Sequence, residues 1–305
     1  MSSPPVRPIV RDELAQLAQP VSVERHRMHD CSSHARSAPP VTHSYAALAF
    51  FTAGRARMEQ RGQWEVSAGD VVLVPAGQPH RALEREGAEL WGLSFCAPCL
   101  AVSTPPSLLA PLERVRDGGA AVVRIPEARR AFLATLFQEL EGALAEPQRE
   151  LEARAATELS LLTLILSEVE RATPGPSAPA LTAAPSVIAV SLRFIERNCL
   201  RPLTLQDVAA AVGRSPAYVT SALSRATGRS AVEWIIAMRM AEARRLLLRS
   251  QEPVDAIAER VGYADATHFI RMFRRASGVT PAAFRAEMRQ PPAATSSAAS
   301  SADSS

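Results

Sequence analysis

Two histidines and two cysteines in the first hundred residues have types and spacings that could support metal or redox chemistry. His43 and His80 are potential transition-metal ligands, but two histidines are too few for such a site without further partners. Cys96 and Cys99 form a single C-x-x-C pair, which has half the ligands of a structural zinc site. A buried, inert pair is the favoured interpretation, with redox or metal roles as alternatives, and Cys31 would join only if the fold brought it near. We expect no metal and no disulfide framework.

Charge is distributed unevenly along the chain. Residues 186–290 carry 16 arginines against 9 acidic residues, whereas residues 1–185 carry 18 arginines against 21 acidic residues. A basic segment of this kind is typical of a domain that binds nucleic acid. Arginine can bind phosphate oxygens and can also donate two parallel hydrogen bonds to guanine, so these side chains are candidates for DNA contacts.

Two short helix pairs are predicted within this basic segment. In the first pair, a helix around 205–212 ends at Gly213, and Ser215 with Pro216 begins the next helix. In the second pair, a helix around 254–261 ends at Gly262, and Asp265 caps the next helix. A helix, a tight turn containing glycine and a second helix make a helix-turn-helix. A long amphipathic helix over Ala231–Arg249 would serve as a rigid spacer between the two units.

Apolar spacing indicates which side of each second helix is buried. The inward residues predicted for the first unit are Tyr218, Val219, Ala222 and Leu223, and those for the second are Phe269, Met272 and Phe273.

Over residues 187–286 the chain resembles the AraC/XylS transcription regulators. The positions that carry the resemblance are Gly228, Arg239, Ala243, Leu246, Leu247, Ile257, Ala258, Val261, Gly262, Tyr263, Asp265, Phe269, Phe273, Arg274, Gly278, Pro281, Phe284 and Arg285. The resemblance implies two recognition helices placed in successive major grooves on one face of double-stranded DNA. Family members often have a longer polar side chain at the position of Ser221 and an aromatic one at that of Leu223, so this chain departs from them there.

The resemblance also implies roles for particular residues. The base-facing residues would be Ala217, Thr220 and Ser221 in the first unit and Ala266, Thr267, His268, Ile270 and Arg271 in the second. Phosphate contacts would come from Arg225, Arg229, Arg274 and Arg275. Because serine and threonine select weakly among bases, we expect Arg271 to make the largest single base contact.

The N-terminal half has a different pattern, with short apolar runs separated by glycine and proline. Strands are predicted over 46–54, 64–69, 70–77 and 88–95, which suits a small barrel or sandwich. Residues 69–80 resemble the second signature of the cupin fold, where His80 occupies a ligand position, and His43 fits the first signature. Tyr45 replaces the second histidine, and the expected glutamate falls on Ala47 or Leu48. The resemblance therefore implies a cupin-like barrel without a metal.

A barrel of this size can hold one small ligand at its mouth. The candidate lining residues are His43, Trp64, His80 and Trp91. Two helices are predicted after the barrel, around 132–144 and 151–169, and their apolar stripes pack either within the domain or in a dimer interface.

These elements predict an α+β multidomain protein with an N-terminal cupin-like β-barrel, two following helices, and a C-terminal all-α domain with two helix-turn-helix units. The expected boundaries are a flexible N-terminus over 1–20, a ligand-sensing and dimerisation domain over 21–171, a linker over 172–185, a DNA-binding domain over 186–289 and a disordered tail over 290–305. The N-terminus lacks a secretory signal and no segment is apolar enough for a membrane span, so we expect a cytoplasmic protein.

The predicted function is sequence-specific regulation of transcription in response to a small-molecule effector in the barrel. The expected partners are double-stranded DNA, the effector, a second copy of the chain and, for an activator, RNA polymerase. Neither catalytic residues nor a cofactor are expected. Two alternatives stay open: a cupin-type enzyme fused to a DNA-binding tail, and a DNA-alkylation responder that uses Cys96 or Cys99 as methyl acceptor.

Overall fold

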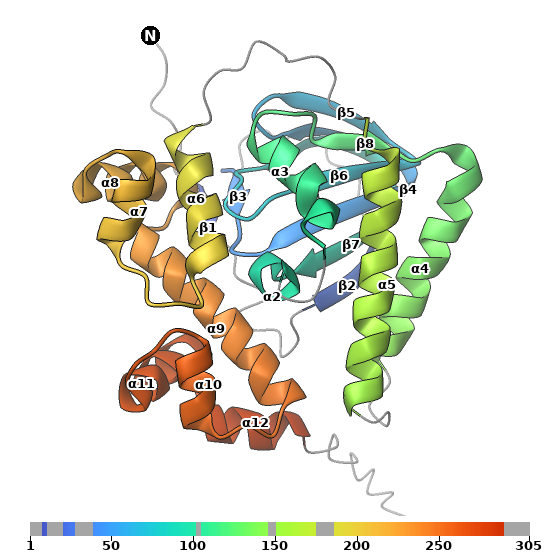
Figure 1. Cartoon of the computed structure of the whole chain (residues 1–305). Helices are drawn as coiled ribbons and strands as arrows, with labels where there is room; N and C mark the ends of the chain where they lie inside the picture. Colours follow the sequence, from blue (N-terminus) through green and yellow to red (C-terminus); the bar gives the residue numbers. More distant parts are fainter. Residues whose placement is uncertain are drawn as a thin grey trace, which may run out of the picture.

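The computed structural model describes residues 8–10, 21–27, 39–101, 105–145, 151–174 and 186–289. Residues 8–174 form an N-terminal part built on a β-sheet, and residues 186–289 form a helical C-terminal part (Figure 1). The expected flexible N-terminus, linker and tail lie largely outside the described residues, as does Cys31. Ile9–Val10 is an exception, because these residues form the short strand β1 that pairs in parallel with β3 (Val41–Thr42).

The N-terminal part is organised around a six-stranded antiparallel sheet. Its order is β2-β7-β4-β6-β8, with β5 paired to β4, and the strands are β2 (Val21–Arg27), β4 (Ala46–Glu59), β5 (Gln63–Ser67), β6 (Asp70–Val74), β7 (Arg81–Phe95) and β8 (Val122–Arg124). β4 and β7 pair along almost their whole length, and three irregularities in their register bend the sheet. The four predicted strands are all present, whereas β2 and β8 were not predicted.

Helices cover one face of this sheet (Figure 1). The short helices α2 (Ala97–Ala101), η1 (Pro106–Leu109) and α3 (Ala110–Arg116) precede the two long helices α4 (Glu127–Ala145) and α5 (Leu151–Ala172). Phe137 of α4 is fully buried and stacks on Phe50 and Trp91 of the sheet. Ile165 of α5 joins the same core, so the apolar stripe of α5 packs within the domain, while Leu164 on its other side is 45% exposed.

The C-terminal part consists of seven helices among the described residues. They are α6 (Val187–Asn198), α7 (Leu205–Val212), α8 (Pro216–Thr227), α9 (Ala231–Arg249), α10 (Val254–Arg260), α11 (Ala266–Ser277) and α12 (Pro281–Arg289). Thr204 and Ser230 begin α7 and α9 with capping boxes, in which each side chain accepts from a backbone amide three residues later. The bounds of α9 are those predicted. Among the described helices, none is both long enough and apolar enough to cross a membrane.

The two parts pack against each other through buried polar contacts as well as apolar ones. Arg116 of α3 is only 4% exposed and makes a two-pronged ion pair with Glu196 of α6, in which Nη2 lies 2.7 Å from Oε1. Thr42 donates from its hydroxyl to the carbonyl of Thr227, at the end of α8, over 2.8 Å. Gly77 approaches α6 and α9 so closely that a Cβ there would lie 2.8 Å from a methyl carbon of Leu192.

Candidate nucleic-acid interface and ligand cavity

The first predicted recognition helix is α8, and it exposes a small polar face. Ser215 accepts a hydrogen bond from the amide of Tyr218 over 3.3 Å and thereby fixes the start of the helix. Ala217 and Ser221 are exposed and Thr220 is half-buried, as expected for the face that points away from the core. Val219, Ala222 and Leu223 are buried.

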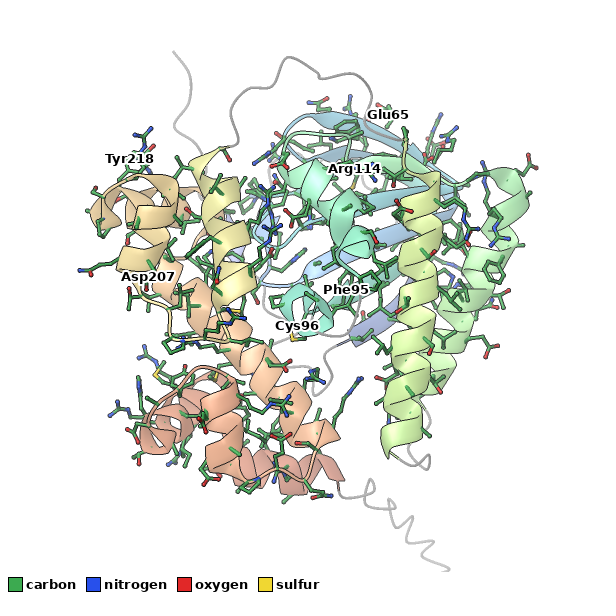
Figure 2. The ribbon with its side chains drawn as sticks, viewed as in Figure 1. Glu65, Phe95, Cys96, Arg114, Asp207 and Tyr218 are labelled. Carbon is green, nitrogen blue, oxygen red and sulfur yellow. A yellow bond between two sulfur atoms is a disulfide. The ribbon has the colours of Figure 1, made fainter. Side chains whose placement is uncertain are left out.

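Tyr218 was predicted to point inward, and that prediction is wrong. Its side chain is 46% exposed, and the guanidinium of Arg214 lies 5.9 Å from its ring (Figure 2). Helical spacing could have revealed this, because Tyr218 lies three residues before Ser221 and therefore shares its side of the helix. Tyr218 and Arg214 add an aromatic and a basic group to a face that otherwise carries only short side chains.

The second predicted recognition helix is α11, and its exposed face is larger and more basic. Asp265 begins the helix by accepting from the amides of Thr267 (2.9 Å) and His268 (3.1 Å), and these amide hydrogen bonds lower the pKa of its carboxyl. Thr267, His268 and Arg271 are exposed, as is Ile270. Ala266 is half-buried. Phe269 and Phe273 are fully buried and anchor the opposite side of the helix, as predicted.

α9 connects the two helix-turn-helix units, and Arg239 in it links the α6–α7 connection to the second unit. Its Nε and Nη2 atoms donate to the carbonyls of Cys199 and Arg201, each over 2.7 Å, next to the first unit. Its guanidinium also lies 5.1 Å from the ring of Tyr263 in the second unit. The orientation of α8 relative to α11 is therefore fixed by a buried side chain as well as by the helix.

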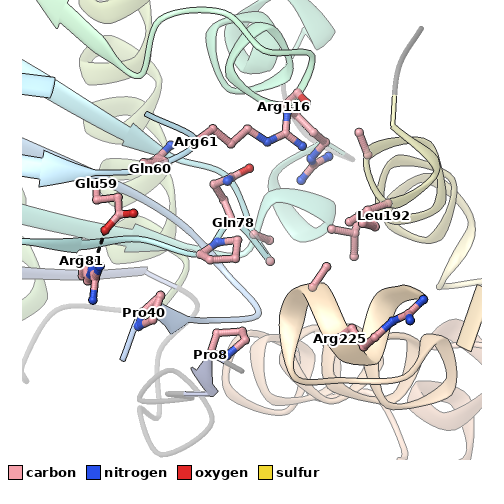
Figure 3. Close-up of a pocket in the computed structure, with 16 residues that line it drawn as sticks. Pro8, Pro40, Glu59, Gln60, Arg61, Gln78, Arg81, Arg116, Leu192 and Arg225 are labelled. Atoms are coloured by element: carbon pink, nitrogen blue, oxygen red, sulfur yellow. Dashed lines mark hydrogen bonds and ion pairs between the residues drawn. The ribbon is translucent and has the colours of Figure 1, made fainter. Parts of the chain in front are cut away.

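The four predicted phosphate-binding arginines have different surroundings. Arg274 and Arg275 are exposed on α11. Arg225 is also exposed, but it belongs to the wall of a cavity between the two parts of the molecule (Figure 3). Arg229 is half-buried, its guanidinium lies 6.0 Å from the ring of Trp234, and burial lowers its pKa. Arg229 is thus the least accessible of the four.

The cavity in Figure 3 lies between the sheet and the C-terminal helices and has a volume of about 360 Å³. Gln78 and Arg61 line it from the N-terminal part, and Leu192 of α6 lines it from the C-terminal part. Arg61 donates to the backbone carbonyl of Arg116 over 2.6 Å. Burial, and then the neighbouring charge of Arg116, lower the pKa of Arg61.

A second cavity, of about 350 Å³, opens on the face of the sheet opposite α4 and contains two of the predicted effector-pocket residues. The rings of His43 and His80 are 5.0 Å apart, and Tyr45 stacks on His43 at 4.1 Å. The Nδ1 atom of His43 donates to the carbonyl of Tyr45 over 2.7 Å. Burial and the nearby His80 lower the pKa of His43 to about 3, so its imidazole is neutral at physiological pH. The Nε atom of Arg85, another lining residue, is buried and has no hydrogen-bond partner among the described residues.

The structure does not place Trp64 and Trp91 in this cavity. Trp91 is 3% exposed and packs on Phe137 on the helix-covered face, whereas its neighbour Leu90 points into the cavity. Trp64 donates from its indole to the carbonyl of Gln60 over 3.0 Å, at the turn between β4 and β5. Within the described ranges, no cluster of three or more histidine, cysteine or acidic residues could hold a metal ion.

Comparisons with known proteins agree with this arrangement. A cupin domain model matches residues 31–90, and a helix-turn-helix domain model matches residues 208–287. The regulatory protein PocR of Salmonella typhimurium is 32% identical over 124 residues, which cover 41% of this chain and 39% of PocR. The HTH-type transcriptional regulator YpdC of Escherichia coli is 25% identical over 231 residues, covering 74% of this chain and 76% of YpdC.

These matches agree with the resemblance to AraC-type transcriptional regulators, and they identify a cupin domain followed by a helix-turn-helix domain. The chain therefore joins an N-terminal cupin domain to a C-terminal helix-turn-helix domain, and the predicted fold class is confirmed. One further relative, AdaA of Bacillus subtilis, is named a bifunctional transcriptional activator and DNA repair enzyme, and is 33% identical over 92 residues, which cover 30% of this chain and 44% of AdaA.

Proposed function

We propose that the chain is an AraC-family transcription regulator that binds DNA sequence-specifically by placing α8 and α11 in successive major grooves on one face of the duplex. The observation that carries the proposal is the exposed polar face on each of these helices, both of which lie on the side of the molecule away from α4 and α5 (Figure 1). A helix entering the major groove contacts base edges with the residues of its exposed face. Ala217, Thr220, Ser221 and Tyr218 supply that face in α8.

On α11, Ala266, Thr267, His268, Ile270 and Arg271 occupy the corresponding positions. Arg271 is the only arginine among them, and its guanidinium can donate two hydrogen bonds to one guanine. Arg274 and Arg275 follow on the same helix and would contact phosphates, which position the protein without selecting bases. Arg225 and Arg229 would contribute less, because they lie toward the N-terminal part.

The test begins with selection of bound duplexes from a random pool, followed by affinity measurements on the recovered motif. Arg271→Ala is expected to cost about 1–3 kcal/mol on that motif and to relax selectivity at one base pair. Arg274→Ala on the same helix is the matched control, and we expect it to weaken all sequences evenly and to reduce the salt dependence of binding. An even loss for Arg271→Ala as well would show that it is a phosphate contact, contrary to the assignment.

The effector is proposed to bind in the cavity that contains His43 and His80. Its apolar walls suit a small organic molecule, and the unpaired Nε atom of Arg85 favours one with a hydrogen-bond acceptor. A ligand screen by thermal shift, repeated with Ala49→Phe to fill the cavity, tests this site. Compounds that stabilise the native chain but not the Ala49→Phe variant would support it, whereas equal stabilisation of both would locate the binding site elsewhere.

We also propose that the regulator acts as a homodimer. Phe132 and Leu164 lie on α4 and α5 and are 41% and 45% exposed, which leaves apolar area for a second copy. Light scattering of the wild-type chain and of a Phe132→Glu, Leu164→Glu variant would separate a dimer from a monomer. If the dimer activates transcription, RNA polymerase is its further partner, and transcription in vitro from a promoter carrying the selected motif tests activation directly.

A further inference from the structure

Cys96 and Cys99, which the sequence pattern left with several possible roles, are joined by a disulfide bond in the structure. Cys96 follows the last residue of β7, and Cys99 lies in α2, three residues later. Figure 2 shows Cys96 between the sheet and α9, at the junction of the two parts of the molecule. Both cysteines are buried, with 6% and 5% of their surface exposed.

The exposed remainder of this disulfide faces a cavity of about 320 Å³. Val21, Leu159 and Leu162 give the cavity apolar walls, and Arg245 and Arg249 of α9 also line it. The cavity is therefore enclosed by both the cupin part and the DNA-binding part. Its volume admits a small molecule to the two sulfur atoms.

The location of the bond in a DNA-binding protein makes it unusual. Stable disulfides are rare where thiol reductants are abundant, and those found there are mostly transient bonds with catalytic or redox-sensing roles. The surroundings of the two sulfurs also differ, because the backbone amide of Cys99 donates to the Sγ atom of Cys96 over 3.4 Å. This hydrogen bond would stabilise a thiolate on Cys96 and make that sulfur the better leaving group.

We propose that Cys96 and Cys99 form a thiol–disulfide exchange site for low-molecular-weight thiols, and that α9 responds to its redox state. A thiolate from the reductant attacks the Sγ atom of Cys99, the bond between the two cysteines breaks, and Cys96 leaves as a thiolate. The thiolate of a second reductant molecule then attacks the reductant sulfur of the mixed disulfide, and Cys99 leaves as a thiolate. The protein gains two thiols, and two reductant molecules become one disulfide.

The DNA-binding part can sense this reaction because α2 packs directly on α9 and α6. In the same region, Arg249 of α9 pairs with Glu158 of α5, which is itself only 3% exposed. Reduction separates the two sulfur atoms beyond bonding distance and frees α2, which carries Cys99, to shift against α9 and α6. Such a shift changes how α9 is held against the cupin part, and α9 carries both helix-turn-helix units.

The first experiment counts reactive thiols in the native full-length chain. The protein is oxidised with oxidised glutathione, treated with reduced glutathione or dithiothreitol, labelled with a maleimide and mapped by peptide mass spectrometry. We expect labels to appear on Cys96 and Cys99 without denaturant. Cys199 is the internal control, because burial raises the pKa of its thiol to about 12 and keeps it unlabelled. Labelling of Cys96 and Cys99 only in urea would overturn the exchange site.

The second experiment measures DNA affinity for the selected motif in the oxidised and the reduced protein. We expect the DNA affinities of the oxidised and the reduced protein to differ by at least about fivefold, which is the lower end of the coupling usual between two allosteric sites. The change should disappear in Cys99→Ser and in the Cys96→Ser, Cys99→Ser double variant, and it should persist in Cys199→Ala. Equal affinities in a protein whose thiols have been shown to exchange would refute the coupling to α9. Loss of DNA binding in both redox states would instead count against the proposed DNA contacts.

Discussion

Replacement of Arg239 by methionine should destabilise the DNA-binding part more than any exposed arginine substitution in it. Arg239 is 9% exposed, and its guanidinium serves three partners at once: the carbonyls of Cys199 and Arg201 and the ring of Tyr263. Methionine keeps the apolar stem of the side chain but donates no hydrogen bonds. The variant therefore leaves two carbonyls near the junction of the two units without their charged donors.

The size of the effect follows from these three contacts. A hydrogen bond from a charged donor contributes about 1.5–3 kcal/mol, and a desolvated cation–π contact contributes up to about 2 kcal/mol. Because water can reach part of the site after the change, we expect the free energy of unfolding to fall by about 3–5 kcal/mol in total. The orientation of α8 relative to α11 should loosen as well, so that affinity for the two-groove motif falls further than stability alone explains.

Urea denaturation followed by circular dichroism measures the first effect, and DNA titration at low urea measures the second. Arg260→Met is the matched control, because Arg260 is half exposed and pairs with Glu252 at the surface, which is a contact of about 0–1 kcal/mol. A loss in Arg239→Met no larger than in Arg260→Met would refute the idea that Arg239 joins the two units.

Three further predictions concern stability. The pKa of His43 is lowered to about 3 in the folded protein and is about 6.5 in the unfolded chain, so only the unfolded chain takes up a proton at this residue between pH 6.5 and 3. The free energy of unfolding should therefore fall by about 1.4 kcal/mol for each pH unit below 6.5. Urea denaturation at several pH values should show a smaller fall in His43→Gln, which has no imidazole to protonate. Gly77→Ala should cost more than Gly118→Ala, because both positions have a positive φ that strains alanine but only at Gly77 does the added Cβ meet Leu192 and Trp234. Thr204→Ala should lower stability by about 1 kcal/mol through loss of the α7 capping box, measured by the same urea titration.

The helical half of this protein could be predicted closely because local signals decide it. Ser215 and Asp265 accept the cap hydrogen bonds that their positions predicted, and Gly213 and Gly228 end helices in the left-handed conformation that glycine adopts readily. These interactions join residues a few positions apart, so the local sequence is enough to predict where the helices begin and end. Tyr218 was placed on the wrong face because its ring is apolar enough for a core, although its helical position made it a surface residue.

The cavity could be predicted only in part, because the face of a strand on which a residue lies depends on distant pairings. His43 and His80, which the cupin pattern indicated, both line the cavity. Trp91 does not, because one step along β7 separates Leu90, which faces the cavity, from Trp91, which faces α4. β2 was missed because its outer residues are charged; it pairs with β7 from Val21 to Arg27, and this long-range pairing makes it a strand.

The packing of the two parts could not be predicted at all, because it depends on side chains that lie far apart in the sequence. Arg116 is paired with Glu196 and Glu113, and Arg193 with Glu113 and Asp117, so the junction consists of alternating charges. Such networks add little net stability, because desolvation offsets the attraction, but they allow few alternative arrangements. If the two parts have a second arrangement of similar free energy, a ligand that binds one arrangement better can shift the equilibrium between them. An effector in the cupin cavity and a redox change at Cys96 and Cys99 would both act on this junction, and both would change how α9 presents α8 and α11.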